Sequence, residues 1–504
     1  MAGRKRQYIR NVASWFIRSG AGLVVSLGLM AFLWRKLGTE GVGVWATGAT
    51  IGGSLAILDL NLTSTVERHV AALAAKGKRK DLQMLLGAAL RLMGGLTTAG
   101  AVVAMCLSPL LARAFFKTTA YGYADLVLFV VISVVSFAVL QGGSIYNQFL
   151  SGLKRQDEVN MVGMSGLLVG AGLTAFFAQQ GYPIWSLGVA GLAGNALNVG
   201  LVMARLRKHL PWLSLFSLRT GGGWIGEVWR FSAAGYLFNI WGWLYLSVPK
   251  LILANRLGPG YVAFLEAASK LAYVARNGMQ VLSGYLIPFL AEIQAVEGER
   301  RVHAMMQRAL GYIWMTGMAL GGYILLFRRP LLALWLGTVP SEAVLAAAWM
   351  TAEFTVVGLM VPLVHFAIAQ GRFAHTRPFL AYMIPACVAA PALGLVTGGF
   401  GGFLAWSFAA NALGAALFYV LAFRDRAMSL VWLAGMAVRV LAGAALAAAG
   451  SRWFMTWEAP LPALIGGGFA WCVLAGLVWL ALGLVDTRFA GNALSLFRGR
   501  GGHG

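Results

Sequence analysis

Charged side chains are scarce in this sequence. Asp, Glu, Lys and Arg make up only 11% of its 504 residues, whereas a soluble chain carries about 25%. Hydrophobic residues make up 59%, and apolar runs of about 20 residues recur from Asn11 to Val485. These features exclude a soluble globular domain and predict an all-α polytopic membrane protein.

Cysteines and catalytic motifs are also lacking. The three cysteines, Cys106, Cys387 and Cys472, share no metal-ligand or CxxC spacing, so we expect them to be small packing residues. The sequence has no phosphate-binding loop, no metal-ligand cluster and no nucleophile–base pair. We therefore expect no enzyme activity, no metal and no cofactor.

The apolar runs are long enough for fourteen transmembrane spans, and this even number places both ends of the chain on one side. The predicted spans cover approximately residues 12–34, 43–66, 84–112, 124–150, 161–179, 184–204, 231–250, 261–290, 309–327, 342–368, 379–397, 401–422, 430–450 and 461–484. The first run is of spanning length and ends in no cleavage site, so we interpret it as a retained helix rather than a signal peptide.

The basic residues indicate which side is cytoplasmic. If the N-terminus is cytoplasmic, 27 of the 40 Lys and Arg lie in cytoplasmic segments, 9 lie in outer segments and 4 lie within spans. This bias predicts that both termini are cytoplasmic. It also explains the net charge of +23 by contact with anionic membrane lipids, with no need for nucleic acid.

Two features of the sequence recur at a nearly constant offset along the chain. Arg10 precedes the "LG" of "RKLGTEGVGVW" by the same separation at which Arg230 precedes the "LG" of "NRLGPGYVAF". The glycine of "FLSGLKRQD" at 149–157 likewise matches that of "AIAQGRFAH" at 367–375. Each repeat contains six spans, so the two repeats are parallel and related by an axis along the membrane normal.

The repeat divides the chain into four segments. They are an N-terminal lobe at 1–204, a basic and aromatic interfacial linker at 205–230 on the cytoplasmic surface, a C-terminal lobe at 231–428, and a last segment at 429–504. The last segment holds two additional spans and a basic cytoplasmic tail.

Four stretches carry a resemblance to a known family: "RNVASWF", "RKLGTEGVGVW", "LDLNLTSTVERHVA" and "GLKRQDEVN". Together with the arrangement of six, six and two spans, they resemble the polysaccharide-transporter branch of the multidrug/oligosaccharidyl-lipid/polysaccharide flippase superfamily. Members of that branch are O-antigen and exopolysaccharide repeat-unit flippases of bacterial inner membranes.

The resemblance implies two six-helix lobes around a central cleft that opens alternately to the cytoplasm and the periplasm. The cargo would be a glycan on a polyprenyl diphosphate, and a glycan polymerase or ligase complex would be a partner. Some relatives bind a cation through carboxylates on the seventh, eleventh or twelfth helix. Here residues 231–249, 379–396 and 402–422 contain no Asp or Glu, so the resemblance does not extend to that sodium site.

The second predicted span ends in the charged stretch "ILDLNLTSTVERHV". Asp59, Thr63 and Glu67 are four residues apart, so a continuous helix would place them on one face. We expect Glu67, Arg68 and His69 at the cytoplasmic mouth, where the helix emerges into water. Asp59 lies about 12 Å further along the axis, where we expect it to line the cleft as a substrate-binding residue.

Arg18 and three charges of the eighth span are the other candidates for the cleft. Arg18 lies about 12 Å deeper than Arg10 and either lines the cleft or extends to the inner headgroups. Glu266 and Lys270 are spaced to pair with each other or to bind cargo. Arg276 is near mid-span, where it would pair with a carboxylate of the other lobe, Asp59, or with the cargo diphosphate.

Two further charges and two prolines complete the candidates. Glu353 and Arg439 lie deep in their spans and would line the cleft, pair with each other or support neighbouring residues. Pro385 and Pro391 both fall in the eleventh span, where each removes a backbone hydrogen bond. They predict a broken or bent helix that acts as a hinge, or a static kink.

Three functions remain open from the sequence. The first is a flippase for a lipid-linked oligosaccharide, whose diphosphate favours deep Arg and Lys residues. The second is a small-molecule exporter of the multidrug branch, whose cationic cargo favours Asp and Glu in an aromatic pocket. The third is a non-transporting membrane scaffold for glycan assembly. Arg18, Lys270 and Arg276 favour the flippase, whereas Asp59, Glu266 and Glu353 weaken that preference.

Overall fold

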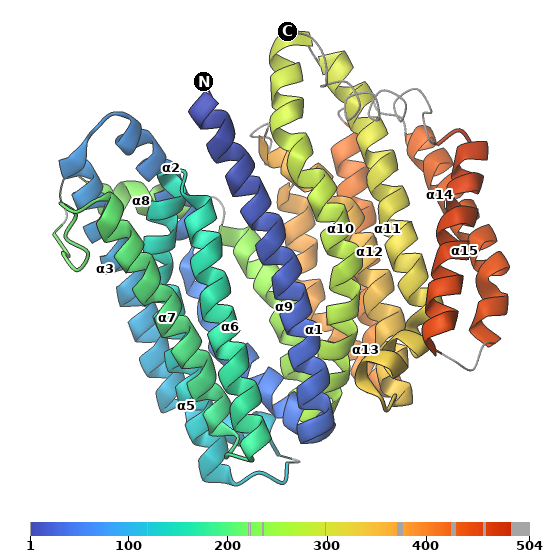
Figure 1. Cartoon of the computed structure of the whole chain (residues 1–504), viewed down its shortest axis with the longest axis horizontal. Helices are drawn as coiled ribbons and strands as arrows, with labels where there is room; N and C mark the ends of the chain where they lie inside the picture. Colours follow the sequence, from blue (N-terminus) through green and yellow to red (C-terminus); the bar gives the residue numbers. More distant parts are fainter. Residues whose placement is uncertain are drawn as a thin grey trace. The chain divides into compact units, whose positions relative to one another are not determined.

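A computed structural model of the chain describes residues 2–117, 119–219, 221, 223–233, 236–297, 299–369, 376–424, 430–456 and 460–484. Within these ranges every regular element is a helix (Figure 1). A helix satisfies its own backbone hydrogen bonds, which lipid cannot do. The all-α membrane fold that the composition predicts is therefore confirmed.

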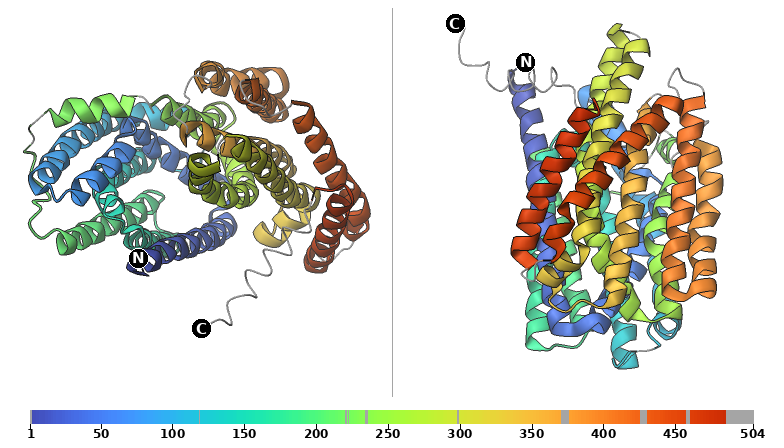
Figure 2. Two further views of the ribbon diagram at one scale, coloured as in Figure 1. Left: turned by 90° about the horizontal axis from the view of Figure 1, so that it is seen from above. Right: turned by 90° about the vertical axis from the view of Figure 1, so that its right-hand side faces the viewer.

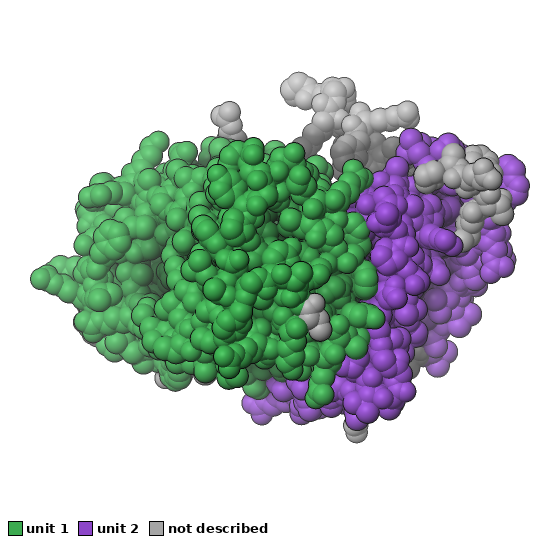
Figure 3. Space-filling model, turned by 90° about the horizontal axis from the view of Figure 1, so that it is seen from below, with its two compact units in different colours: residues 1–266 green, residues 267–504 purple. Residues whose placement is uncertain are grey.

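The chain forms two compact units, residues 1–266 and residues 267–504, which Figure 3 colours separately. In unit 1, α5, α6 and α7 pack side by side, and α1 packs against α5 and α6. Its elements are α1 (Ala2–Gly53), η1 (Ser54–Asp59), α2 (Leu62–Ala75), α3 (Arg79–Cys106), α4 (Ser108–Phe115), α5 (Tyr123–Gly152), α6 (Gln156–Gln180), α7 (Trp185–His209), α8 (Trp224–Ala233) and α9 (Tyr236–Arg256).

Unit 2 contains the remaining helices, although α10 already begins at Pro259. Within it, α11, α12 and α13 pack in sequence, and α14 and α15 lie side by side against α11 (Figure 2). Its elements are α10 (Pro259–Glu297), α11 (Glu299–Leu336), α12 (Ser341–Ala369), α13 (Thr376–Arg424), α14 (Leu430–Ser451), η2 (Arg452–Thr456) and α15 (Pro460–Ala481).

Eleven helical segments of the described residues are long and apolar enough to cross a membrane, so the chain is a multi-pass membrane protein. Two of these segments, Ala13–Asp59 and Arg377–Leu421, each cover two of the predicted spans. Glycines interrupt both: α1 breaks at Gly38, and α13 breaks at Gly398 and Gly399. The total of fourteen spans remains a prediction.

Glycines with positive φ recur at matched positions of the chain. Gly38 and Gly258, which end the two matched "LG" motifs, have φ 69° and 98°. Gly181 and Gly399, which are separated by nearly the same offset, have φ 72° and 57°. Glycine adopts this left-handed conformation readily because it has no Cβ. These turns support the parallel repeat, while the predicted lobe boundaries remain predictions.

The connection after α7 is tied to the end of unit 1 at which α3 begins. The Ser214 N–H donates to Gln83 Oε1 at 2.8 Å, and Tyr146 donates its hydroxyl to the Leu215 carbonyl at 2.9 Å. Leu213 and Leu215 are buried in a cluster with side chains of α2, α3 and α5, whereas Phe216 is 77% exposed. The linker therefore packs against this end of unit 1.

Both prolines of the predicted hinge lie inside α13. Pro385 and Pro391 keep the helix continuous, and the non-helical residues of α13 are Gly398 and Gly399. Of the two predicted forms, broken or bent, the break is not seen at these prolines, because neighbouring helices can support a proline-containing turn without a break; the bent helix and the static kink stay predictions. A hinge at these prolines remains a prediction.

Candidate functional site

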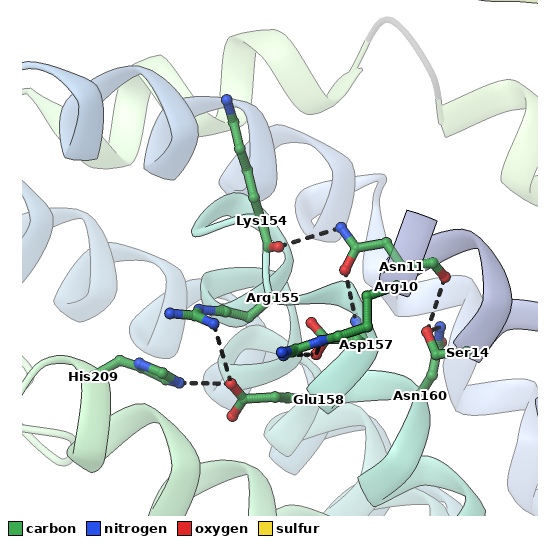
Figure 4. A network of polar contacts seen from close by, with 9 residues as sticks. All are labelled: Arg10, Asn11, Ser14, Lys154, Arg155, Asp157, Glu158, Asn160 and His209. Atoms are coloured by element: carbon green, nitrogen blue, oxygen red, sulfur yellow. Dashed lines mark hydrogen bonds and ion pairs between the residues drawn. The ribbon is translucent and has the colours of Figure 1, made fainter. Parts of the chain in front are cut away.

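A network of polar contacts joins the start of α1 to the start of α6 (Figure 4). Arg10 Nε donates to Asp157 Oδ2 at 2.8 Å; the Arg10 side chain is 57% exposed and that of Asp157 only 4%. Asn11 donates its amide to the Lys154 carbonyl at 3.3 Å and accepts from the Asp157 N–H at 3.2 Å. These contacts fix the entry of α1 to the turn before α6.

The same network extends towards α7. Glu158 Oε1 lies 2.8 Å from His209 Nε2 and 3.9 Å from an Arg155 nitrogen. In the sequence, Arg10 and "GLKRQD" stand out only as markers of the repeat, and these pairs are not predicted. The available signal was a basic helix start matched by two adjacent acids at another helix start.

Arg18 extends this network of polar contacts further along α1. Its Nη1 donates to Asn160 Oδ1 at 3.2 Å, and Asn160 donates in turn to Ser14 at 3.0 Å. The guanidinium lies over Gly163, where an added Cβ would be 2.9 Å from Arg18 Cζ. The Asn160 amide orients Arg18, but a neutral amide does not cancel its positive charge.

The charged stretch after α1 is not the continuous helix that the sequence predicted. Leu60 and Asn61 are both left-handed, with φ 50° and 62°, so η1 ends and α2 begins anew at Leu62. Asp59 accepts from the Thr63 N–H at 3.2 Å and from the Thr63 hydroxyl at 2.8 Å. The prediction that Asp59 and Glu67 share a helix face is therefore wrong, because two left-handed residues reorient the chain between them. Each left-handed residue costs about 1–3 kcal/mol.

Asp59 is partly buried and caps the start of α2 through Thr63. This arrangement gives its carboxylate a local structural task. A carboxylate has about four acceptor positions, so Asp59 keeps acceptors for the predicted role in the cleft.

The three residues expected at the cytoplasmic mouth lie on α2. Glu67 and Arg68 are exposed, whereas His69 contacts α8. The His69 ring has Nδ1 at 2.8 Å from the Thr65 carbonyl and Nε2 at 3.3 Å from Glu227 Oε1, and its edge meets the Trp224 ring. His69 thus connects α2 to α8, the helix that follows the linker.

Glu266 finds a partner that the sequence reasoning did not consider. Its Oε2 accepts from Lys250 Nζ of α9 at 2.5 Å. The spacing within α10 favours Lys270 as the pairing candidate. Spacing within one helix could not show that α9 brings a lysine to Glu266. Lys270 itself is partly buried on α10.

Arg276 lies on α10 beside a pair of aromatic rings of unit 2. Its Cζ is 5.6 Å from the ring centroid of Tyr273 and 5.7 Å from that of Phe354 on α12. These two rings contact each other edge to face at 5.0 Å. Among the described residues, the buried Nε of Arg276 has no hydrogen-bond partner. Ring faces stabilise a cation but leave its N–H groups available to an anion.

Glu353 and Arg439 are placed differently from each other. Glu353 is 4% exposed and accepts from the Asn411 amide at 3.2 Å, so α13 provides this contact. Arg439 is exposed on α14. The suggested pairing between them is replaced by the Glu353–Asn411 bond. Nowhere in the described ranges do three His, Cys, Asp or Glu side chains come together as metal ligands.

Solved transporter structures share this fold. The lipid II flippase MurJ in an inward closed conformation is similar with a TM-score of 0.71 and 10% identity, over 92% of this chain and 98% of that one. VcmN, a MATE transporter of Vibrio cholerae, gives a TM-score of 0.56 and 15% identity, over 85% and 100%. The MATE multidrug transporter DinF-BH gives 0.55 and 16%, over 84% and 96%. Curated proteins give no match.

The sequence itself matches a family model. Residues 90–345, just over half of the chain, match the model of the polysaccharide biosynthesis protein family. Together with the fold shared with flippases and MATE transporters, this match confirms the resemblance noted from the sequence. The chain therefore belongs to the polysaccharide biosynthesis protein family.

Proposed function

We propose that the protein is a bacterial inner-membrane flippase for a polyprenyl-diphosphate-linked oligosaccharide, such as an O-antigen or exopolysaccharide repeat unit. It moves this cargo from the cytoplasmic to the periplasmic leaflet by alternating access between its two lobes. The family match supports a glycan as the cargo class, and the name of the MurJ relative supports a lipid carrier.

Arg276 is the observation that carries this proposal. A cation near mid-span costs at least about 2.5–3.5 kcal/mol on insertion scales. Arg276 meets ring faces and has a buried Nε without a hydrogen-bond partner in the described structure. A diphosphate supplies what is missing, because a planar guanidinium donates two parallel hydrogen bonds to phosphate oxygens.

Arg18 provides a second cation for the cargo path, in unit 1. The Asn160 amide orients the Arg18 guanidinium, which lies over Gly163. We assign Arg18, Asp59, Lys270 and Arg276 as substrate-binding residues and Glu266, Glu353 and Arg439 as cleft or supporting residues. Glu67, Arg68 and His69 form the cytoplasmic mouth, and Pro385 and Pro391 are hinge candidates.

The membrane partners follow from the charge. The bias of the basic segments supports a cytoplasmic location for both termini, against anionic lipids. A glycan polymerase or ligase complex would take the cargo on the periplasmic side. Reporter fusions at Gly3 and after Arg500 should both report a cytoplasmic location, and a periplasmic report from either would contradict this topology.

The decisive experiment is transport by the purified full-length chain in proteoliposomes. A polyprenyl-diphosphate-linked oligosaccharide is placed in one leaflet, and its arrival in the other is read by cleavage with added glycosidase. We expect Arg276→Lys to lose most of the transport rate, because an ammonium is a point donor and cannot replace the planar fork. The control Arg452→Lys changes an exposed arginine of η2 that has no assigned role, and it should leave the rate unchanged.

Two results separate the competing functions. Export of cationic drugs with no movement of the lipid-linked glycan would support the multidrug exporter. Movement of neither, by a folded chain, would support the scaffold. Wild-type transport by folded Arg276→Ala protein would overturn the role of Arg276.

A further inference from the structure

Two adjacent cations, Arg35 and Lys36, lie just before the break of α1 at Gly38. Both side chains are exposed. The first predicted span ends at residue 34, so the predicted topology puts this pair at the periplasmic surface. From its start to Gly38, α1 contains no Asp or Glu, so this stretch of helix supplies no carboxylate to neutralise the two charges.

The two cations line a hollow in the surface of α1, which we call the Arg35–Lys36 hollow. Its volume is about 270 Å³, and the described residues that line it are Gly28, Ala31, Phe32, Arg35 and Lys36. A Cβ added at Gly28 would meet nothing within 4 Å, so this part of the lining is open. Pockets for drug-sized ligands measure about 300–1,000 Å³. The hollow therefore suits a charged headgroup rather than a whole oligosaccharide.

An apolar strip runs from the hollow along one side of α1. Ile17, Val24 and Ala31 are seven residues apart, which is about two helical turns, so they share this side. Ile17 is 61% exposed and Val24 is 70% exposed. Val24 lies about 16 Å from Arg35 along the axis, towards the middle of the membrane. A cationic end that continues into an exposed apolar strip complements a lipid with an anionic head and a hydrocarbon chain.

Lys36 is also aligned with Arg18, the cation that the proposed function assigns to the cargo path in unit 1. Lys36 follows Arg18 by about five helical turns, and α1 is helical throughout this interval (Figure 1). The two residues therefore start from the same side of the helix, about 27 Å apart along its axis. A diphosphate that leaves Arg18 towards the periplasmic side thus reaches a second cation on the same helix.

We propose that the Arg35–Lys36 hollow binds the diphosphate of the lipid carrier in the periplasmic leaflet, with the polyprenyl chain against the apolar strip. The inference rests on the proposed function and adds a release site to it. A guanidinium donates two parallel hydrogen bonds and an ammonium adds a point charge, so the pair suits two linked phosphates. A phospholipid with one phosphate shares this chemistry but fills only part of it.

Protection of Lys36 from an amine reagent tests this site. The full-length chain in nanodiscs is acylated with a membrane-impermeant amine reagent, and labelling of Lys36 is read by peptide mass spectrometry. We expect polyprenyl diphosphate to slow the labelling about tenfold, because the bound phosphates accept hydrogen bonds from the ammonium. Polyprenol, which lacks the diphosphate, and phosphatidylglycerol at the same mole fraction should leave the labelling rate nearly unchanged.

Three variants keep the test decisive. Gly28→Leu fills the hollow but keeps both cations, and it should abolish the protection of Lys36. This variant should fold, because a Cβ at this position meets open space and leucine is a good helix former. Arg35→Gln should weaken the protection several-fold. The matched control is Lys117→Gln, which removes an exposed cation after α4 on the same predicted side and should leave the protection intact.

The outcomes distinguish this inference from the proposed function. Equal protection by phosphatidylglycerol and polyprenyl diphosphate would show general contact with membrane phosphates and overturn the release site. Full protection in Gly28→Leu would also overturn it. If the wild-type chain moves the lipid-linked glycan in proteoliposomes but polyprenyl diphosphate does not protect Lys36, the release site fails and the flippase stands. Loss of both protection and transport in the folded wild-type chain would overturn both.

Discussion

The two units differ in the side chains that contact their cations. In unit 1, Arg10 pairs with Asp157, and Lys250 pairs with Glu266, so opposite charges meet across helix junctions. In unit 2, Arg276 is held by the faces of Tyr273 and Phe354. A carboxylate neutralises a cation and occupies its donors, whereas a ring stabilises the charge and leaves the donors free. The difference separates charges that hold helices together from a charge suited to a passing anion.

Replacing Arg276 should have the largest effect. If Arg276 binds the diphosphate as proposed, Arg276→Gln would remove two charge-assisted hydrogen bonds, so we expect polyprenyl diphosphate to bind about 100-fold more weakly. Arg18→Gln should cost only a few-fold, because Asn160 already uses part of the Arg18 fork. Native mass spectrometry of both variants measures the ratio. Equal losses of affinity for the two variants would contradict the difference between Arg276 of unit 2 and Arg18 of unit 1.

Removing the buried member of the Arg10–Asp157 pair should destabilise unit 1. Asp157→Ala leaves Arg10 without its acceptor, and we expect a loss of about 1–3 kcal/mol in the free energy of unfolding. Chemical unfolding in detergent measures it. The control is Glu342→Ala, which removes only an exposed hydrogen bond to Ser341 and should have an effect near zero. An unchanged stability for Asp157→Ala would show that this pair is not a structural one.

The ring faces around Arg276 can be tested with a matched pair of variants. Phe354→Leu removes one face of the cation–π contact, whose contribution is about 0.5–2 kcal/mol, so both stability and diphosphate binding should fall modestly. Tyr273→Phe keeps the ring and should change neither. Equal behaviour of the two variants in both measurements would argue that the rings only fill space.

The smallest expected effect concerns sodium. Neither α9 nor α13 contains Asp or Glu, so we expect transport in proteoliposomes to be the same with and without a sodium gradient. Potassium replaces sodium in the control. Strict sodium dependence would instead indicate a site built from uncharged oxygens.

Much of the fold followed from the sequence because lipid restricts the possible structures. Apolar length predicted helices, and the "LG" motifs at Gly38 and Gly258 proved to be turns with positive φ. The pairing of Arg10 with Asp157 and of Lys250 with Glu266 could not be predicted, because each joins residues of different helices. Periodicity places a residue on a helix face but does not identify the helix that it meets.

The break in the charged stretch shows a second limit. Leu60 and Asn61 adopt left-handed conformations without glycine or proline, so no residue type signalled the end of the helix. Asp59, Lys270 and Arg276 were chosen for charge alone. In the structure, Asp59 bonds to Thr63 and Arg276 lies over the rings of Tyr273 and Phe354. Composition alone predicts neither contact.

The left-handed residues at Leu60 and Asn61 have a consequence for hydration. A helix that stops and restarts leaves backbone N–H and C=O groups without helical partners. Lipid tails cannot bond to these groups, so such a break is tolerated only where it is enclosed by protein or reached by water. Asp59 accepts from the N–H groups of Leu62 and Thr63, and the Asn61 carbonyl accepts from Thr65. Any group of the break that these bonds do not satisfy needs solvent or ligand, so we expect water to penetrate unit 1 to the depth of Asp59, and hydrogen exchange at Leu60 and Asn61 to be faster than in α5.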